Sequence, residues 1–164
     1  MILYFLRHGD AGAVRPQDDD ARQLTAEGVA ELQAAAQTWR RLGIRPEVVI
    51  SSPLPRAQQS AALLIAGVGL ATQPVIDERL KPGAQWADLA QAMAAHADAQ
   101  RIAFVGHEPD LSQAVALLTG ATSLRLRKGG MAGVEFEGTP EPGGGELAWL
   151  LDPDLYQAEA DGAA

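Results

Sequence analysis

Five consecutive apolar residues, Ile2 to Leu6, open the chain and stop abruptly at Arg7, His8 and Gly9. A short run of this kind is typical of a strand that is buried on both faces of a sheet. In open α/β sheets, ligands bind beyond the carboxyl ends of the strands. The run therefore predicts a central strand and the place of a functional site, although an isolated Arg–His pair also fits an ordinary surface turn.

The same succession of apolar strand, polar loop and helical pattern recurs along most of the chain. Three further segments have strand character, and they cover residues 47–50, 73–76 and 102–106. Helical spacing of apolar residues follows each strand, over residues 26–42, 57–66, 86–97 and 111–118. This alternation predicts an α/β fold, a three-layer α/β/α sandwich with a mainly parallel central sheet and helices on both faces.

The C-terminal part has a different pattern. Residues 131–137 and 146–151 have strand character, and a loop rich in glycine and proline joins them, so that we expect a hairpin. Residues 1–152 are expected to form one domain. The acidic stretch 153–164 is expected to fray.

The net charge and the lengths of the apolar runs limit what kind of partner the protein can bind. The formal net charge of −8 argues against binding to nucleic acid or to an anionic membrane surface, since proteins with those partners carry a basic face. No apolar run approaches the roughly 20 residues of a membrane helix, and the first strand lacks the basic flank of a signal peptide. We therefore expect a cytoplasmic protein.

Basic side chains follow three of the four alternating strands. Arg7 and His8 follow the first strand, Arg56 closes the loop after the second, and His107 follows the fourth. Parallel strands end at one edge of the sheet, so these side chains are expected to converge. Guanidinium groups match phosphate oxygens, and histidine can form a covalent phosphoryl intermediate. The set predicts a phosphoryl site without a cofactor, because no glycine-rich phosphate loop, kinase signature or magnesium-binding Asp pair lies near these strand ends.

A metal site is the alternative that the residue types leave open. His8, Asp10, His107 and Asp110 carry suitable ligand atoms. However, Pro109 breaks the helical spacing that a two-histidine zinc site needs, so that metal-independent chemistry is favoured.

Four motifs give the chain a resemblance to the histidine phosphatase superfamily, which includes the cofactor-dependent phosphoglycerate mutases. The motifs are Leu6-Arg7-His8-Gly9, Leu24-Thr25-Ala26-Glu27-Gly28, Ser51-Ser52-Pro53-Leu54-Pro55-Arg56-Ala57 and Val105-Gly106-His107. Ser60 stands where the family's third motif ends in threonine. The resemblance extends from residue 2 to about residue 137 and implies a phosphoglycerate mutase-like fold.

The resemblance also implies roles for individual residues. His8 would be the nucleophile, and Arg7, Arg56 and His107 would grip the phosphate oxygens. Arg22 matches a further phosphate-binding arginine. His107 would be protonated beside the bound anion.

Within the superfamily, the short chain, the Arg-His-Gly-Asp start and the Gly-His-Glu-Pro segment look most like the SixA branch. That branch removes phosphate from phosphohistidine in proteins, so a phosphotransfer domain is the implied kind of partner. Larger members carry an acid four residues before a glycine in the loop after the third strand. Counted back from Gly83, that place holds Arg79, and Glu78 lies one place off.

A missing acid favours phosphohistidine as substrate, because imidazole leaves more readily than an alkoxide. The alternatives are a phosphomonoesterase for a small phosphate ester, with Glu78 as the acid, and a phosphate-binding module without turnover. Arg125, Arg127 and Lys128 form either a positive rim around an open site or a solvated edge. The three aspartates at 18–20 are expected to be solvated.

Overall fold

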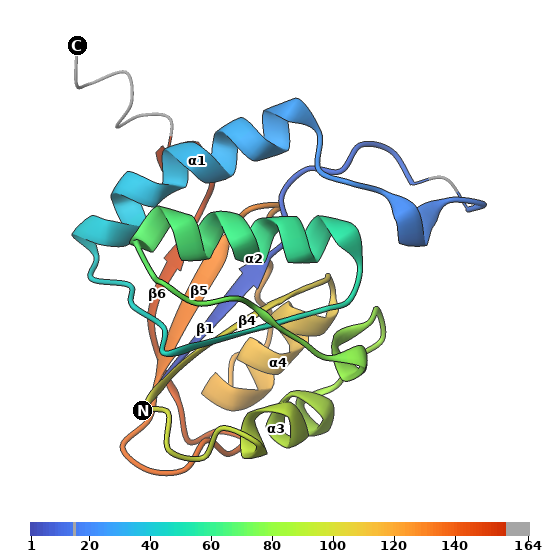
Figure 1. Cartoon of the computed structure of the whole chain (residues 1–164). Helices are drawn as coiled ribbons and strands as arrows, with labels where there is room; N and C mark the ends of the chain where they lie inside the picture. Colours follow the sequence, from blue (N-terminus) through green and yellow to red (C-terminus); the bar gives the residue numbers. More distant parts are fainter. Residues whose placement is uncertain (15, 157–164) are drawn as a thin grey trace.

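A six-stranded sheet forms the centre of the molecule in the computed structural model, which describes residues 1–14 and 16–156 (Figure 1). The strands are β1 (Ile2–Arg7), β2 (Val48–Ser51), β3 (Val75–Ile76), β4 (Arg101–Gly106), β5 (Met131–Glu135) and β6 (Glu146–Leu151). The α-helices are α1 (Ala26–Arg41), α2 (Pro55–Val68), α3 (Trp86–Ala94) and α4 (Asp110–Thr119), and η1 (Asp19–Ala21) and η2 (Glu78–Leu80) are 3-10 turns. No helix in the described ranges is long and apolar enough to cross a membrane.

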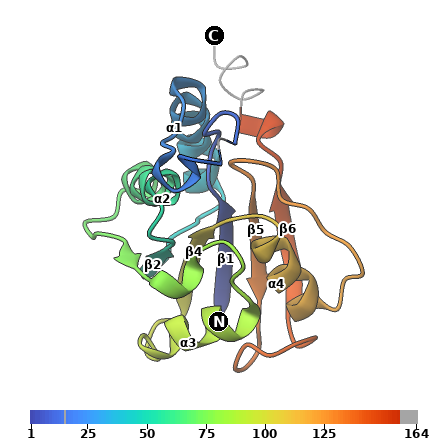
Figure 2. The same ribbon diagram turned by 90° about the vertical axis from the view of Figure 1, so that its right-hand side faces the viewer.

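β1 is a central strand, as its apolar run predicts. The strand order is β3-β2-β4-β1-β5-β6, and Figure 2 shows β1 between β4 and β5. Phe5 lies opposite Phe104 of the parallel neighbour β4 and opposite Ala132 of the antiparallel neighbour β5. β2 is parallel to β4 and β3, whereas β5 and β6 form the predicted antiparallel hairpin. The mainly parallel α/β sheet is thus confirmed.

Helices cover both faces of the sheet. Leu3 and Phe5 of β1 point into a core that includes residues of α3 and α4. Tyr4 and Leu6 point into a second core with residues of α1 and α2. Because successive side chains of a strand face opposite sides, a strand between two cores must be apolar throughout. The predicted three-layer sandwich is therefore confirmed (Figure 1).

One boundary near the site differs from the sequence expectation. Arg56 lies in the first turn of α2 rather than in the preceding loop, since the helix already begins at Pro55. Proline suits the first helical position, because the N–H it lacks has no partner there and its φ is fixed near the helical value. The side chain of Arg56 is thereby attached to a rigid element.

The C-terminal segment packs onto the domain beyond residue 152. Tyr156 is 1% exposed, lies edge-on against Trp39 of α1, and donates a hydrogen bond from its hydroxyl to the Gly129 carbonyl at 3.1 Å. Residues 153–156 thus differ from the frayed tail that we expected. The remainder of that stretch, 157–164, lies outside the described residues.

Candidate active site

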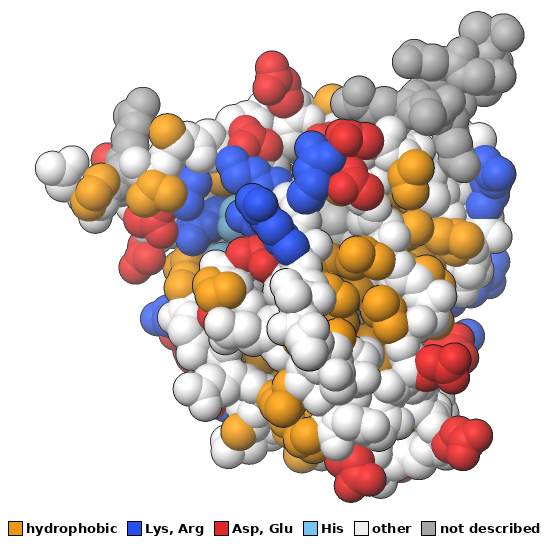
Figure 3. All heavy atoms as spheres, turned by 180° about the vertical axis from the view of Figure 1, so that it is seen from behind, with side chains coloured by type: hydrophobic (Ala, Val, Ile, Leu, Met, Phe, Trp, Pro, Cys, Tyr) orange, Lys and Arg blue, Asp and Glu red, His pale blue; other side chains and the backbone are white. Residues whose placement is uncertain are grey.

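Five of the predicted site residues meet in one cavity of about 260 Å³ at the carboxyl end of β1, whereas Glu78 lies outside it. It is lined by Arg7, His8, Gly12, Val14, Asp19, Arg22, Arg56, Pro82, His107, Glu108 and Lys128. Figure 3 shows Lys and Arg side chains gathered around histidine on this face of the molecule. The expected convergence of the strand ends is confirmed, and the chemical roles of the residues stay predictions.

The turn after β1 is fixed on several sides. The His8 amide donates to the Gly106 carbonyl at 3.1 Å, which continues the β1–β4 ladder, and the Gly9 amide donates to Ser60 Oγ at 3.1 Å. A Cβ on Gly9 would lie only 3.0 Å from a methyl group of Leu32, so that a larger residue has little room there. Ser60, which replaces the family's threonine, therefore supports the turn directly.

Helix α1 is attached to the same turn through the second motif. Thr25 caps the helix, because its hydroxyl accepts from the Gly28 amide at 3.0 Å and donates to Asp10 Oδ2 at 2.9 Å. A Cβ on Gly28 would collide with the backbone of Asp10. Glycine at this motif position thus permits the close approach of α1 to the turn.

His8 is buried and presents an unprotonated nitrogen. Its Nδ1 lies 2.8 Å from the Gly9 carbonyl. A carbonyl oxygen only accepts, so Nδ1 carries the proton in the neutral ring, and Nε2 keeps its lone pair. Burial, together with the charges of Arg56 and Arg7, lowers the pKa of His8 to about 4, whereas the bond to Gly9 opposes this shift. His8 is therefore neutral at neutral pH, and its free Nε2 suits the predicted role of nucleophile.

Asp19 holds two of the arginines, contrary to the expectation that the aspartates at 18–20 are solvated. Arg56 donates from Nη1 to the Asp19 carbonyl at 2.6 Å and from Nη2 to its carboxylate at 3.3 Å. Arg22 donates from Nε to the same carboxylate at 2.8 Å. Arg56 also donates from Nε to His8 Nε2 at 3.3 Å. Asp19 thus occupies donors that a phosphoryl group would need.

Arg7 supplies a further, half-buried cation. Its Nη1 donates to the Leu126 carbonyl at 2.9 Å, and its Nε has no hydrogen-bond partner within the described part of the chain. Burial lowers the pKa of Arg7. Cations brought together away from water in this way favour an anion between them.

His107 completes the cavity from the end of β4. Its ring lies edge-on to that of His8, with 5.2 Å between the ring centroids, and its Nε2 lies 2.8 Å from Ser52 Oγ. Burial, and then the repulsion of a protonated ring by His8 in its charged form and by Arg56, lower the pKa of His107 to about 3. His107 is therefore neutral before substrate binds. The protonation that we expect requires the bound dianion, which favours the charged ring.

Comparisons with known proteins agree with this geometry. The sequence model of the histidine phosphatase superfamily (branch 1) matches residues 3–82. An uncharacterized protein of Picosynechococcus sp. is 39% identical over 142 residues, which cover 82% of this chain and 84% of that protein. The chain belongs to the histidine phosphatase superfamily. The recognition based on four short motifs is thus confirmed.

Solved structures show how widely the superfamily fold is shared. The protein histidine phosphatase SixA complexed with tungstate has a TM-score of 0.82 and 24% identity, and the match covers 94% of this chain and 99% of that one. A phosphoserine phosphatase mutant of Entamoeba histolytica in complex with phosphoserine has a TM-score of 0.66 and 17% identity, with 93% and 97% coverage. At these identities the likeness shows the fold.

The two candidate acids of this superfamily member have very different positions. Glu78 lies on η2, has a side chain that is 73% exposed, pairs with Lys81 at 2.7 Å, and does not line the cavity. Glu108, which sequence reasoning did not single out, lines the cavity beside His107. Its carboxylate accepts from the Ser112 hydroxyl at 2.6 Å, and burial raises its pKa. The sequence signal that could have identified Glu108 was its position directly after His107.

A metal centre finds no support in the geometry. Among residues 1–14 and 16–156, no group of three or more His, Asp or Glu side chains is arranged to hold a metal ion. Asp10, one of the four residues considered, instead accepts from Lys128 Nζ at 2.6 Å.

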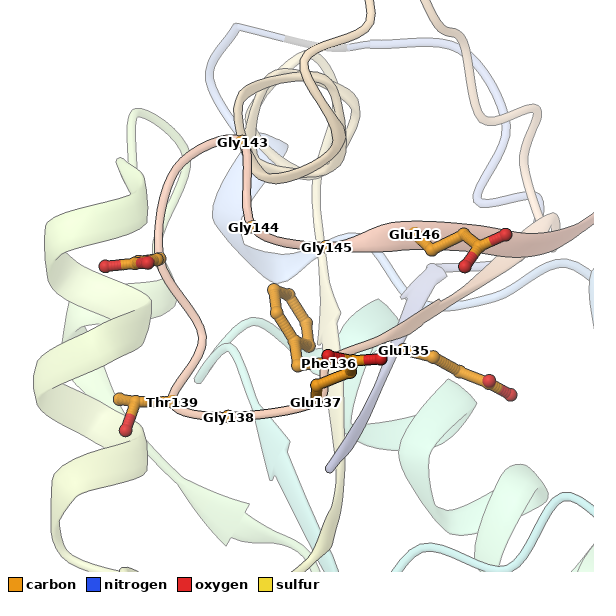
Figure 4. Close-up of a pocket in the computed structure, with 10 residues that line it drawn as sticks. Glu135, Phe136, Glu137, Gly138, Thr139, Gly143, Gly144, Gly145 and Glu146 are labelled. Atoms are coloured by element: carbon orange, nitrogen blue, oxygen red, sulfur yellow. The ribbon is translucent and has the colours of Figure 1, made fainter.

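A larger cavity lies at the opposite end of β1. It has a volume of about 790 Å³ and is formed by the loop between β5 and β6, where the Phe136 ring points toward Gly144 and Gly145 (Figure 4). The Met1 amino group donates to the Phe136 carbonyl at 2.8 Å, which places this loop beside the start of β1. The larger volume of this cavity therefore does not identify the candidate active site, because the predicted site residues lie at the other end of β1.

Proposed function

We propose that this chain is a phosphohistidine phosphatase that acts on phosphorylated protein through a covalent intermediate on His8. The observation that carries the proposal is the neutral, unprotonated Nε2 of His8 in a cavity lined by Arg7, Arg22, Arg56 and His107. Such a site combines a nucleophile with the charges that stabilise a phosphoryl group in transfer.

In the first step, His8 Nε2 attacks the phosphorus atom of phosphohistidine. The new N–P bond forms while the N–P bond of the substrate breaks, and the electron pair passes to the leaving imidazole nitrogen, which takes up a proton. Phosphoryl oxygens replace Asp19 and His8 as the acceptors of Arg56. Exchanging one set of acceptors for another keeps the buried guanidinium hydrogen-bonded throughout.

In the second step, water attacks the phosphorus and the bond to His8 breaks, which releases inorganic phosphate and regenerates the neutral imidazole. The arginines neutralise the charge in both steps, so that the proposed reaction is independent of metal ions. Turnover is therefore expected to be unchanged by a chelator. A loss of activity that zinc or magnesium restores would contradict this part of the proposal.

The position of Glu78 supports phosphohistidine over a phosphate ester. This exposed carboxylate pairs with Lys81 and lies outside the cavity lining, so that no acid from that loop serves the leaving group. An alkoxide needs such a proton, and general acid catalysis is worth roughly 10²–10⁴-fold. Imidazole is a better leaving group, because its ring nitrogen can take up a proton from solvent before the N–P bond breaks. The likeness to the SixA structure adds support for the same substrate class.

A phosphomonoesterase is the second candidate, and Glu108 is the observation that favours it. Its carboxyl lines the cavity and its raised pKa would make it a better proton donor than an ordinary glutamate. A phosphate-binding module without turnover is disfavoured, because binding alone does not need the unprotonated Nε2 of His8.

The test compares turnover of a phosphohistidine peptide, a phosphoserine peptide and an aryl phosphate. We expect the phosphohistidine peptide to have the highest kcat/KM, His8→Ala to abolish turnover, and Arg56→Ala to lower it by roughly 10²-fold or more, as the loss of a preorganised charge donor does. His96→Ala, which changes a histidine outside the cavity lining, is the matched control. Turnover that survives in His8→Ala would refute the mechanism, and a faster phosphoserine reaction would favour the second candidate.

A further inference from the structure

A second cavity adjoins the phosphate cavity on the side of the loop that precedes β5. It has a volume of about 340 Å³ and is lined by Arg7, Asp10, Glu31, Arg125, Arg127, Lys128 and Pro153. Arg7 and Lys128 line both cavities. A group that binds in the second cavity would therefore lie next to the phosphoryl group.

The loop that carries these cations is held against the turn after β1. The Leu126 carbonyl accepts from Arg7, and the Leu126 amide donates to Ser112 Oγ at 2.9 Å. The Gly129 amide donates to the carbonyl of His8 at 3.1 Å, and the Gly130 carbonyl accepts from the Arg7 amide at 3.0 Å. The position of the loop is thus fixed relative to the nucleophile, so that little entropy is lost when a ligand contacts it.

The three cations of this loop differ in how far they are neutralised. Arg127 pairs with Asp152 at 2.8 Å and with Asp154 at 2.6 Å. Lys128 pairs with Asp10 alone. Arg125 is exposed and has no ion-pair partner among residues 1–14 and 16–156. The uncompensated positive charge therefore lies on Arg125, beside the already cationic Arg7.

We propose that Arg125, next to Arg7 and the singly paired Lys128, forms a docking rim for acidic side chains that flank the phosphohistidine on the partner protein. This inference rests on the proposed phosphohistidine phosphatase function. The second cavity lies beside the phosphate cavity, and Arg125 is exposed at its edge. A group that contacts Arg125 would therefore belong to the partner's surface around the phosphorylated residue. In Figure 3 basic and acidic side chains are mixed on this face, so a cation without an ion-pair partner would favour the approach of an acidic group to a chain with a net charge of −8.

Two phosphohistidine peptides of equal length test the rim, one with aspartate and one with glutamine on either side of the phosphohistidine. In wild type, the acidic peptide is expected to have the lower KM. Arg125→Gln is expected to raise KM for the acidic peptide about two- to fivefold, the usual range for an exposed charge pair, without a comparable change in kcat. Arg127→Gln is the matched variant, and we expect a smaller effect because its charge is already neutralised.

Salt gives an independent readout, since the Debye length falls from ~30 Å at 0.01 M to ~8 Å at 0.15 M ionic strength. The difference in KM between the two peptides should shrink over this range in wild type and stay small in Arg125→Gln. Equal effects of Arg125→Gln on both peptides, or an equal effect of Arg127→Gln, would overturn the rim while leaving the phosphatase function intact. If wild type hydrolyses neither peptide, the proposed function fails and the rim fails with it. If an added carboxylate lowers KM for a small phosphate ester but not for the phosphohistidine peptide, the docking of a partner protein is also overturned.

Discussion

Acidification from pH 7 to pH 5 is expected to destabilise the fold through the two buried histidines of the site. His8 and His107 are 6% and 4% exposed, and burial is the main cause of their low pKa values of about 4 and about 3. In the unfolded chain both rings have a pKa of about 6.5. The unfolded state therefore binds more protons between these values, and the stability that is present above pH 6.5 is lost as the pH falls toward 4.

The size of the loss follows from the two pKa values of each ring. Between pH 8 and pH 5, each histidine is protonated in the unfolded chain but stays neutral in the folded one. This difference lowers the free energy of unfolding by about 2 kcal/mol for each histidine. Glu108 and Asp110 have raised pKa values in the folded protein and act in the opposite direction. The contribution of a single histidine is therefore best isolated by comparing variants.

Urea denaturation followed by tryptophan fluorescence at pH 7 and pH 5 measures this contribution. We expect His8→Gln to lose about 2 kcal/mol less than wild type on acidification, whereas His96→Gln should follow wild type. If His8→Gln loses as much stability as wild type between the two pH values, His8 is not buried as a neutral ring and the argument for its unprotonated Nε2 is wrong.

Two further substitutions test the charges around the cavity. Asp19→Asn removes the carboxylate that competes for Arg22 and Arg56, so the competitive inhibition constant of inorganic phosphate should fall about two- to fivefold, whereas a rise would mean that Asp19 positions the arginines. Glu78→Gln should change kcat/KM by less than about twofold on phosphohistidine and phosphoserine peptides, as most surface substitutions do. A loss of about 10²-fold on the phosphoserine peptide would instead identify Glu78 as the general acid.

The strands near the site could be predicted because their signals are local. The run from Ile2 to Leu6 has no polar residue, and only a strand between two cores requires that pattern. Its end at Arg7 and His8 then located the site, since the carboxyl ends of parallel strands meet at one edge. The convergence with His107 follows from the same rule.

Other features depend on contacts between segments that are distant in sequence, and no local pattern encodes them. In the sequence Asp19 is an ordinary polar loop residue. Only the structure shows that Asp19 accepts hydrogen bonds from Arg56 of α2 at the predicted phosphate site. Tyr156 lies in an acidic stretch, yet the space between Trp39 and Gly129 buries it.

The sequence by itself therefore determined the strands of the sheet and the basic residues at their ends, because strand patterns and strand ends are local features of neighbouring residues. The predicted role of His8 as nucleophile came from the motifs shared with the superfamily. Only the tertiary structure decided which carboxylates face that nucleophile. It placed Glu108 in the cavity and Glu78 in solvent, because the direction of a loop side chain is set by packing against elements far along the chain.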